Sequence, residues 1–220
     1  MWFDRGRSFG GLRKRYKAFP NGMVEALDPV SADIVAFKTE LQYDNWLLRR
    51  FDAAIQDLDI RPKRLAQMRN GKRTESQPAL AFRNEKGSRI VEWVVAKGSV
   101  EPCDLEAVVP FEKSHPVQVS VRARDTIRSN QVLLANLDHV RQTLAMHVNV
   151  DLAAEQRATL HALQEEPEMK LALLLSRAQT QSTVDVSIRV EAALLRLFAD
   201  GTVKLNLSEV PYGTKTIISI

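Results

Sequence analysis

The sequence contains a single cysteine, Cys103, and only four histidines. One thiol cannot form an internal disulfide. None of the histidines has a cysteine or another close histidine at the spacing of metal ligands. These histidines are His115, His139, His147 and His161. A structural zinc site is therefore not expected.

Long apolar runs are also missing. No stretch approaches the roughly 20 apolar residues needed to span a bilayer, and residues 1–16 are basic and glycine-rich without the apolar segment of a secretory signal. We therefore expect a cytoplasmic protein without a membrane contact. Hydrophobic residues make up 45% of the 220 residues, which is enough to bury a core in one large domain or two small ones.

The positive charge is modest in total but concentrated in two segments. The net charge of +4 permits nucleic-acid binding without establishing it. Such clusters suit contacts with phosphates, and the open alternative is an ordinary solvated face. The predicted DNA-binding residues are Arg13, Lys14, Arg15 and Lys17 in the first segment and Arg61, Lys63, Arg64, Lys72 and Arg73 in the second.

The hydrophobic periodicity predicts an α/β unit followed by a smaller helical unit. In the first unit we expect a long amphipathic helix over 32–58, strands over 60–68, 78–83, 88–96 and 116–122, and a helix over 125–147. In the second unit we expect helices over 151–166, 169–178 and 185–199, then a β-hairpin formed by 203–207 and 216–220. Three helices followed by a hairpin is the order of a winged helix.

Several segments occur in the order found in one family of DNA nucleases. They are RKRYKAFPNG (13–22), LQYDNWLLRRFD (41–52), the series IRPKRL, NGKRTESQPALAF and SRIVEWVVAK, and VSVRARDTIRSNQVLLANLDHVRQTL (119–144). Together with the C-terminal pattern, they resemble TnsA, the endonuclease subunit of heteromeric cut-and-paste DNA transposases. The resemblance implies an α/β fold with a restriction-endonuclease-like PD-(D/E)xK domain over 1–148, whose basic segment covers about 1–30. A winged-helix domain over 149–220 would follow.

In that family, a helix glutamate, a strand aspartate and a further glutamate or glutamine hold Mg²⁺, and a lysine helps to position the water and phosphate. The corresponding positions here are Gln42, Ala79, Val95 and Lys97. Mg²⁺ needs oxygen ligands, preferably charged ones, yet two of the three ligand positions have no side-chain oxygen and the third is neutral. The resemblance therefore implies an inactive nuclease that binds no metal or other cofactor.

Glu40 and Glu92 are acids close in sequence to the ligand positions Gln42 and Val95. Glu40 precedes Gln42 by two residues, which is roughly 200° around a helix, so it is predicted to point away from Gln42. Glu92 precedes Val95 by three residues, an odd offset, so on a strand it is predicted to emerge on the face opposite Val95 and Lys97.

The resemblance implies three kinds of partner: transposon-end DNA, a DDE-type transposase and an AAA+ ATPase. The predicted helix over 185–199 has few exposed cations, Arg189 and Arg196, and this favours protein contacts over DNA contacts for the C-terminal unit. Two other functions stay open: an active metal-dependent endonuclease with relocated carboxylates that cuts transposon ends, and a DNA-binding regulator with the same fold.

Overall fold

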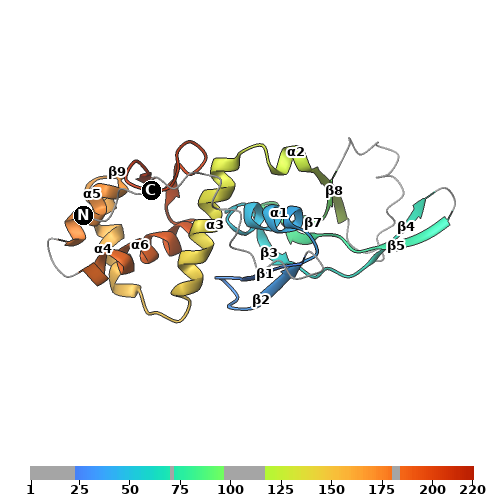
Figure 1. The fold of residues 1–220 in the computed structure, drawn as a ribbon, viewed down its shortest axis with the longest axis horizontal. Helices are drawn as coiled ribbons and strands as arrows, with labels where there is room; N and C mark the ends of the chain where they lie inside the picture. Colours follow the sequence, from blue (N-terminus) through green and yellow to red (C-terminus); the bar gives the residue numbers. More distant parts are fainter. Residues whose placement is uncertain (1–22, 70–71, 97–116, 180–183) are drawn as a thin grey trace.

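The computed structural model describes residues 23–69, 72–96, 117–179 and 184–220, and has a mixed α/β fold. A region of strands with α1 and α2 occupies one end, and a cluster of helices occupies the other (Figure 1). The helix α3 (Gln131–Met146) lies between them and packs against both α1 (Glu40–Arg50) and α6 (Val184–Ala199). No helix in these ranges is long and apolar enough to cross a bilayer.

The first region contains eight strands and two helices among the described residues. The strands are β1 (Val24–Leu27), β2 (Ile34–Phe37), β3 (Gln56–Asp59), β4 (Leu65–Arg69), β5 (Lys72–Ser76), β6 (Leu80–Arg83), β7 (Arg89–Val95) and β8 (Val117–Ala123); the helices are α1 and α2 (Arg124–Ile127). β3, β6, β7 and β8 form one sheet in that order, antiparallel except for the parallel pair β7–β8.

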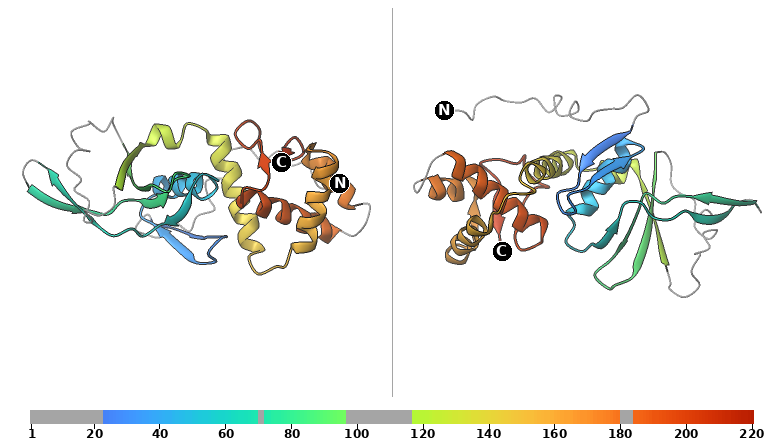
Figure 2. Two further views of the ribbon diagram at one scale, coloured as in Figure 1. Left: turned by 180° about the vertical axis from the view of Figure 1, so that it is seen from behind. Right: turned by 90° about the horizontal axis from the view of Figure 1, so that it is seen from below.

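Two antiparallel hairpins stand beside this sheet. One is formed by β1 and β2, and the other by β4 and β5. The β4–β5 hairpin extends from the end of the molecule that lies away from the C-terminal helices, as Figures 1 and 2 show from three directions. It is therefore the described element of the first region that reaches furthest from the joint at α3.

The predicted helix over 32–58 is wrong at both ends. Residues of β2 alternate in burial, with Val35 and Phe37 buried and Ile34 exposed, so this stretch follows the period of a strand. Thr39 then starts α1, because its side chain accepts a hydrogen bond from the N–H of Gln42, at 3.2 Å. The helix ends at Arg50, and the chain turns into β3.

Most other strands of the first region are confirmed, with shifted bounds. β6, β7 and β8 correspond to the predicted strands over 78–83, 88–96 and 116–122. The single strand expected over 60–68 is wrong, because β3 ends at Asp59 and β4 begins only at Leu65. The helix expected over 125–147 is divided, since Asn130 caps α3 by accepting a hydrogen bond from the N–H of Leu133.

The second region follows the order helix, strand, helix, helix, strand, strand. Its elements are α4 (Ala153–Glu165), β9 (Glu168–Lys170), α5 (Leu171–Gln179), α6, β10 (Lys204–Leu205) and β11 (Ile217–Ser219). β11 lies between β10 and β9 in a three-stranded antiparallel sheet. The helix predicted from Met169 is therefore wrong at its start, because Met169 pairs with Ile218 in this sheet.

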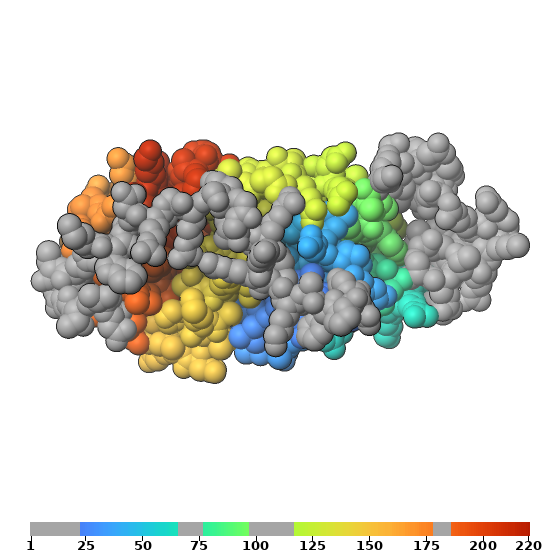
Figure 3. Space-filling view, in the orientation of Figure 1, coloured from blue at the N-terminus to red at the C-terminus, as the bar shows by residue number. Residues whose placement is uncertain are grey.

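One apolar core joins the two regions. Tyr43, Trp46 and Leu47 of α1 are buried together with Leu195 of α6 and Leu207, which follows β10. In the space-filling view, the residues of α2 and α3 bridge the blue and the orange-red parts of the surface (Figure 3). A second core lies between α4, α5 and α6, so α6 takes part in both. Burial on this scale is the main favourable term in holding the regions together.

Candidate functional site

A buried polar cluster lies between α1 and the central sheet. At its centre is Glu92 of β7, whose side chain is fully buried. Glu92 Oε1 accepts hydrogen bonds from Asn45 Nδ2 at 2.7 Å and from Arg49 Nε at 3.2 Å. Its Oε2 accepts from Arg49 Nη2 at 2.5 Å and from Ser120 Oγ at 3.1 Å. Both carboxylate oxygens are therefore held by protein donors.

Helix and strand periodicity bring these side chains together. Asn45 and Arg49 are four residues apart on α1, so they lie on one face of the helix. Glu92 is the register partner of Ser120 on the parallel strand β8, and neighbours across a ladder share a face. Two residues further along β8, Arg122 emerges on the same face. The cluster is thus built from one helix and two adjacent strands.

The cluster contains two cations. Arg122 Nη1 donates to Asn45 Oδ1 at 2.9 Å, so the Asn45 amide connects Arg122 to Glu92. Burial lowers the pKa of Arg122 from its ordinary value, and the nearby charge of Arg49 lowers it further. The Arg49 guanidinium also lies over the ring of Phe82, at 5.1 Å from the ring centroid. A single buried carboxylate therefore faces two guanidinium groups.

Three of the four predicted catalytic positions lie within the described residues. Gln42 is in the first turn of α1, where its Oε1 accepts a hydrogen bond from the N–H of Lys38 at 3.0 Å. The N–H of Ala79 donates to the carbonyl oxygen of Glu92 at 2.7 Å, immediately before β6. Val95 is the last residue of β7, and Lys97 lies outside the described residues.

The faces of β7 separate Val95 from α1. Glu92 points at α1, as its hydrogen bonds to Asn45 and Arg49 show. Val95 follows at an odd offset on the same regular strand, so its side chain faces the other side of the sheet. The prediction that Glu92 and Val95 lie on opposite faces of the strand agrees with this ladder. Glu92, and not Val95, is on the face that α1 covers. The convergence of Gln42, Ala79, Val95 and Lys97 stays a prediction.

Sequence reasoning missed the cluster for an identifiable reason. The strand period predicts that Glu92 faces away from Val95, but it does not show that α1 covers the face of Glu92. The available signal was the pair Asn45 and Arg49 at helical spacing, together with an acid and Arg122 on neighbouring strands. The other acid, Glu40, is exposed on α1 and lies 3.6 Å from Arg128 Nη2.

The cluster does not suit Mg²⁺. It offers one carboxylate, and both oxygens already accept hydrogen bonds from Arg49, Asn45 or Ser120. A hard divalent cation needs several free oxygen ligands and is repelled by neighbouring guanidinium groups. In the described part of the chain, no three His, Cys, Asp or Glu side chains are grouped so that they could hold a metal ion.

The predicted DNA-binding residues fall into three groups. Arg61, Lys63 and Arg64 are exposed between β3 and β4. Lys72 and Arg73 are on β5, where they pair in register with Arg69 and Met68 of β4. The first segment, with Arg13, Lys14, Arg15 and Lys17, lies outside the described residues. The two described groups therefore lie one after the other along the chain, first in the segment that leads into the β4–β5 hairpin and then in the hairpin itself.

The predicted partner contacts of α6 are engaged within the chain. Arg189 Nε donates to Glu155 Oε1 at 2.5 Å, and its Nη2 donates to the carbonyl of Asp151 at 2.7 Å. Arg196 donates to the carbonyl oxygens of Val150 and His147, at 3.2 Å and 2.9 Å. Both arginines are only partly exposed and connect α6 to α4 or to the end of α3. Because both guanidinium groups already bind groups of the same chain, these contacts do not support a role for the two arginines in binding a partner.

A scan against protein-family models and a search of curated proteins find no match to this chain. The functional argument therefore depends on the chemistry of the cluster and the placement of the basic residues.

Proposed function

We propose that this chain is a DNA-binding protein of TnsA-like construction that has lost its nuclease activity and acts in DNA transposition. The observation that carries the proposal is the enclosure of Glu92, whose carboxylate oxygens are all held by Arg49, Asn45 and Ser120. A nuclease of the PD-(D/E)xK type needs acidic oxygens open to a metal ion. Here the buried acid on the helix side of the sheet is neutralised by arginine.

The order of the elements supports a restriction-endonuclease-like first domain. A helix, α1, is followed by the antiparallel strands β3, β6 and β7 and then by β8, parallel to β7. This is the sequence of elements that the resemblance implies. In the second region, the order helix, strand, helix, helix, strand, strand, with β11 central, supports a winged helix.

The position of α6 bears on how such a winged helix would work. Four successive residues of α6, Ala192 to Leu195, are fully buried against neighbouring elements. A helix that is apolar on all sides serves as a core element, so this part of α6 is not available to enter a DNA groove. We therefore assign DNA binding to the first region. The transposase or ATPase partner would contact other surfaces of the second region.

The route of the basic residues supports DNA binding by the first region. Arg61, Lys63 and Arg64 are exposed beside the start of the β4–β5 hairpin, which carries Lys72 and Arg73. A two-stranded β-ribbon fits the major groove of B-DNA, and cations next to it neutralise phosphates. Contacts of this kind position a protein on DNA and carry little sequence information.

Charge reversal tests this assignment. The triple change Arg61→Glu, Lys63→Glu and Arg64→Glu should weaken DNA binding at low salt at least tenfold, similarly for unrelated sequences. It should also reduce the slope of log K against log salt by about 2 to 3, because each lost phosphate contact removes about 0.9. Fluorescence anisotropy with labelled duplexes over a salt series measures both quantities.

The matched control is Lys170→Glu, Lys204→Glu and Lys215→Glu, since these lysines are exposed in the second region and the change in net charge is the same. This control should keep most of the affinity and the salt slope. If both triple variants lose binding equally, the residues between β3 and β4 make no particular contact and belong to an ordinary solvated face.

A further inference from the structure

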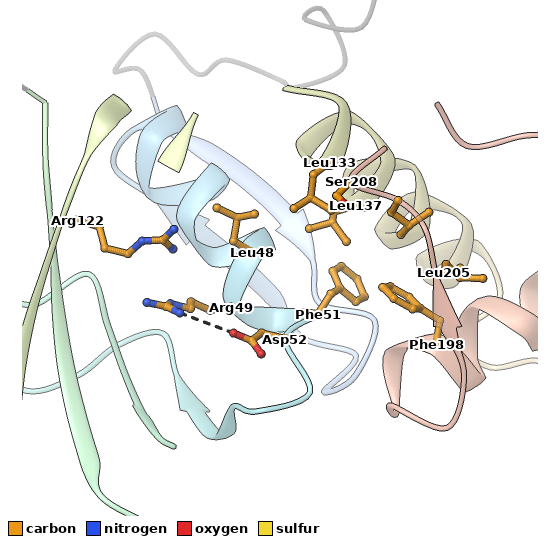
Figure 4. Close-up of a pocket in the computed structure, with 11 residues that line it drawn as sticks. Leu48, Arg49, Phe51, Asp52, Arg122, Leu133, Leu137, Phe198, Leu205 and Ser208 are labelled. Carbon is orange, nitrogen blue, oxygen red and sulfur yellow. Dashed lines mark ion pairs between the residues drawn. The ribbon is translucent and has the colours of Figure 1, made fainter. Parts of the chain in front are cut away.

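A hollow of about 400 Å³ opens where the two regions meet. Its walls come from α1, β8, α3, α6 and β10, and Figure 4 shows the side chains that line it. The volume is within the range of roughly 300–1,000 Å³ that is typical of small-molecule sites. The hollow adjoins the buried cluster through Arg49 and Arg122, but most of its lining comes from other residues.

One side of the hollow is apolar. Leu133 and Leu137 of α3 face Leu48 of α1 across it (Figure 4). Phe51 and Phe198 stack at its edge, with ring centroids 6.2 Å apart and an interplanar angle of 22°. Aromatic and aliphatic walls of this kind favour an apolar body and gain from removing its surface from water.

The other side carries a guanidinium with unused donors. Within the described residues, the bond from Arg122 Nη1 to Asn45 is the one hydrogen bond of the Arg122 side chain, which leaves its Nε and Nη2 without a partner. Arg49 differs, because its donors are directed to Glu92 and, at 3.7 Å, to Asp52. Arg122 is therefore the residue of the lining that can bind an anion with two parallel hydrogen bonds, from Nε and Nη2.

The surrounding charges restrict which anion fits. Arg49 and Arg122 are balanced by Glu92 and by Asp52, whose carboxylate also lines the hollow. Asp52 repels every anion, but it repels a dianion about twice as strongly as a monoanion, so a monoanion fits better beside the guanidinium that has free donors. Burial and the charge of Arg49 lower the pKa of Arg122, and an added anion would offset the second of these effects.

We propose that this hollow binds a small amphipathic carboxylate, with the carboxylate on Arg122 and an aromatic or aliphatic body between Leu48, Leu133, Leu137 and the Phe51–Phe198 pair. Such a ligand contacts α1 and β8 on one side and α3 and α6 on the other. Its binding therefore stabilises the joint between the two regions. This site does not depend on the function proposed above.

The test uses 3-phenylpropanoate and its uncharged amide as probes with the full chain. The carboxylate should bind with a Kd of about 1 mM, which is the affinity expected of a ligand of this size. It should shift the backbone amide signals of Leu48, Phe51, Leu133 and Leu137 in two-dimensional NMR titrations. The amide should bind at least tenfold more weakly, since a charge-assisted hydrogen bond is lost.

Two variants separate the ionic contact from the fold. Arg122→Gln should weaken carboxylate binding at least tenfold and leave amide binding unchanged. Asp52→Asn keeps an oxygen for the N–H of Ala54, which donates to Asp52 Oδ1 at 3.1 Å, and should strengthen carboxylate binding about threefold. The Asp52→Asn variant should also bind the dianion phenyl phosphate more tightly than the unmodified protein does.

Three results would overturn the proposal: no shifts with 10 mM 3-phenylpropanoate, equal binding of the carboxylate and the amide, or undiminished carboxylate binding by an Arg122→Gln variant whose NMR spectrum shows a folded protein. If the Arg122→Gln variant does not fold, the test depends on Asp52→Asn alone. Carboxylate binding that is no stronger in Asp52→Asn than in the unmodified protein would then contradict the proposed site.

Discussion

The carboxylate of Glu92 is buried and accepts hydrogen bonds from protein groups of α1 and β8, and those from α1 hold the helix against the sheet. A buried carboxylate is costly unless it is paired and hydrogen-bonded, and here Arg49, Asn45 and Ser120 supply four donor contacts. The same contacts occupy the lone pairs that a divalent cation would need. At this residue, the requirements of folding and of metal binding therefore compete for the same oxygens.

Removing the Glu92 charge should destabilise the protein. Glu92→Gln leaves the partly exposed Asp52 as the nearby carboxylate for Arg49 and Arg122, so the free energy of unfolding should fall by about 3 kcal/mol, as expected for a broken buried ion pair. Urea denaturation followed by circular dichroism measures this change. Combining Glu92→Gln with Arg49→Met should cost less than the sum of the two single changes, because the two side chains interact.

An exposed arginine–glutamate pair provides the control. Arg177 and Glu166 are 2.7 Å apart on the surface, each with a side-chain exposure of 43%. Glu166→Gln should change the stability by less than about 0.5 kcal/mol. A loss below about 1 kcal/mol for Glu92→Gln would mean that the cluster is solvated and that its carboxylate is less enclosed than the contacts indicate.

At the scale of elements, local sequence patterns predicted three strands of the central sheet and the helices of the second region, but not the bounds of the first helix. β6, β7 and β8 were recognisable because runs such as 88–96 are apolar and bounded by turn residues; Gly87, with a φ of 74°, makes the turn before β7. The helix over 32–58 was overextended, because Val35 and Phe37 fit a helical stripe as well as a strand. The stretch with these two residues is a strand because it pairs with β1, and that pairing cannot be read from the sequence of the stretch itself.

The C-terminal strands illustrate the same limit. β9 and β10 have only three and two residues, too few for a period to be read from the sequence. Met169 could begin a helix on its own pattern, and it is held in a strand by its partner Ile218, far along the chain. Likewise, which face of the sheet α1 covers depends on tertiary packing and cannot be read from the sequence of α1 alone.

α3 makes the joint between the regions, and Asn136 holds it. This buried side chain donates through Nδ2 to the carbonyl oxygens of Leu207 and Val210, both at 2.7 Å, and its Oδ1 accepts from the N–H of Tyr212 at 2.8 Å. Asn136→Ala leaves these three backbone groups without a partner and should lower the free energy of unfolding by about 3 kcal/mol.

The effect of Asn136→Ala should reach both regions. Because the core is shared, the variant should still unfold in one transition, with circular dichroism and tryptophan fluorescence, to which Trp46 and Trp93 of the first region contribute, changing together. Gln131→Ala, at an exposed position of the same helix, should change the stability by less than about 0.5 kcal/mol. A fluorescence transition that is unmoved by Asn136→Ala would show that the two regions are independent.

At the scale of the whole molecule, the proposed function assigns different tasks to the two ends. The β4–β5 hairpin and its neighbouring cations are at one end, and the helices α4, α5 and α6 are at the other (Figure 1). A protein with this arrangement can bind DNA at one end and a partner at the other, without cutting. In the proposed function, the resemblance to TnsA suggests which partners bind, and the enclosed carboxylate of Glu92 is the reason to expect no cleavage.

The central claim is that the chain binds DNA and does not cleave it. The most direct measurement is incubation of supercoiled plasmid with Mg²⁺ or Mn²⁺, at a protein concentration that saturates the plasmid in a band-shift assay. We expect the bound plasmid to stay supercoiled, because Glu92 offers no free oxygen to a metal ion. Metal-dependent nicking that disappears in Glu40→Gln or Glu92→Gln, purified in the same way, would contradict it and would identify the acid that serves the metal.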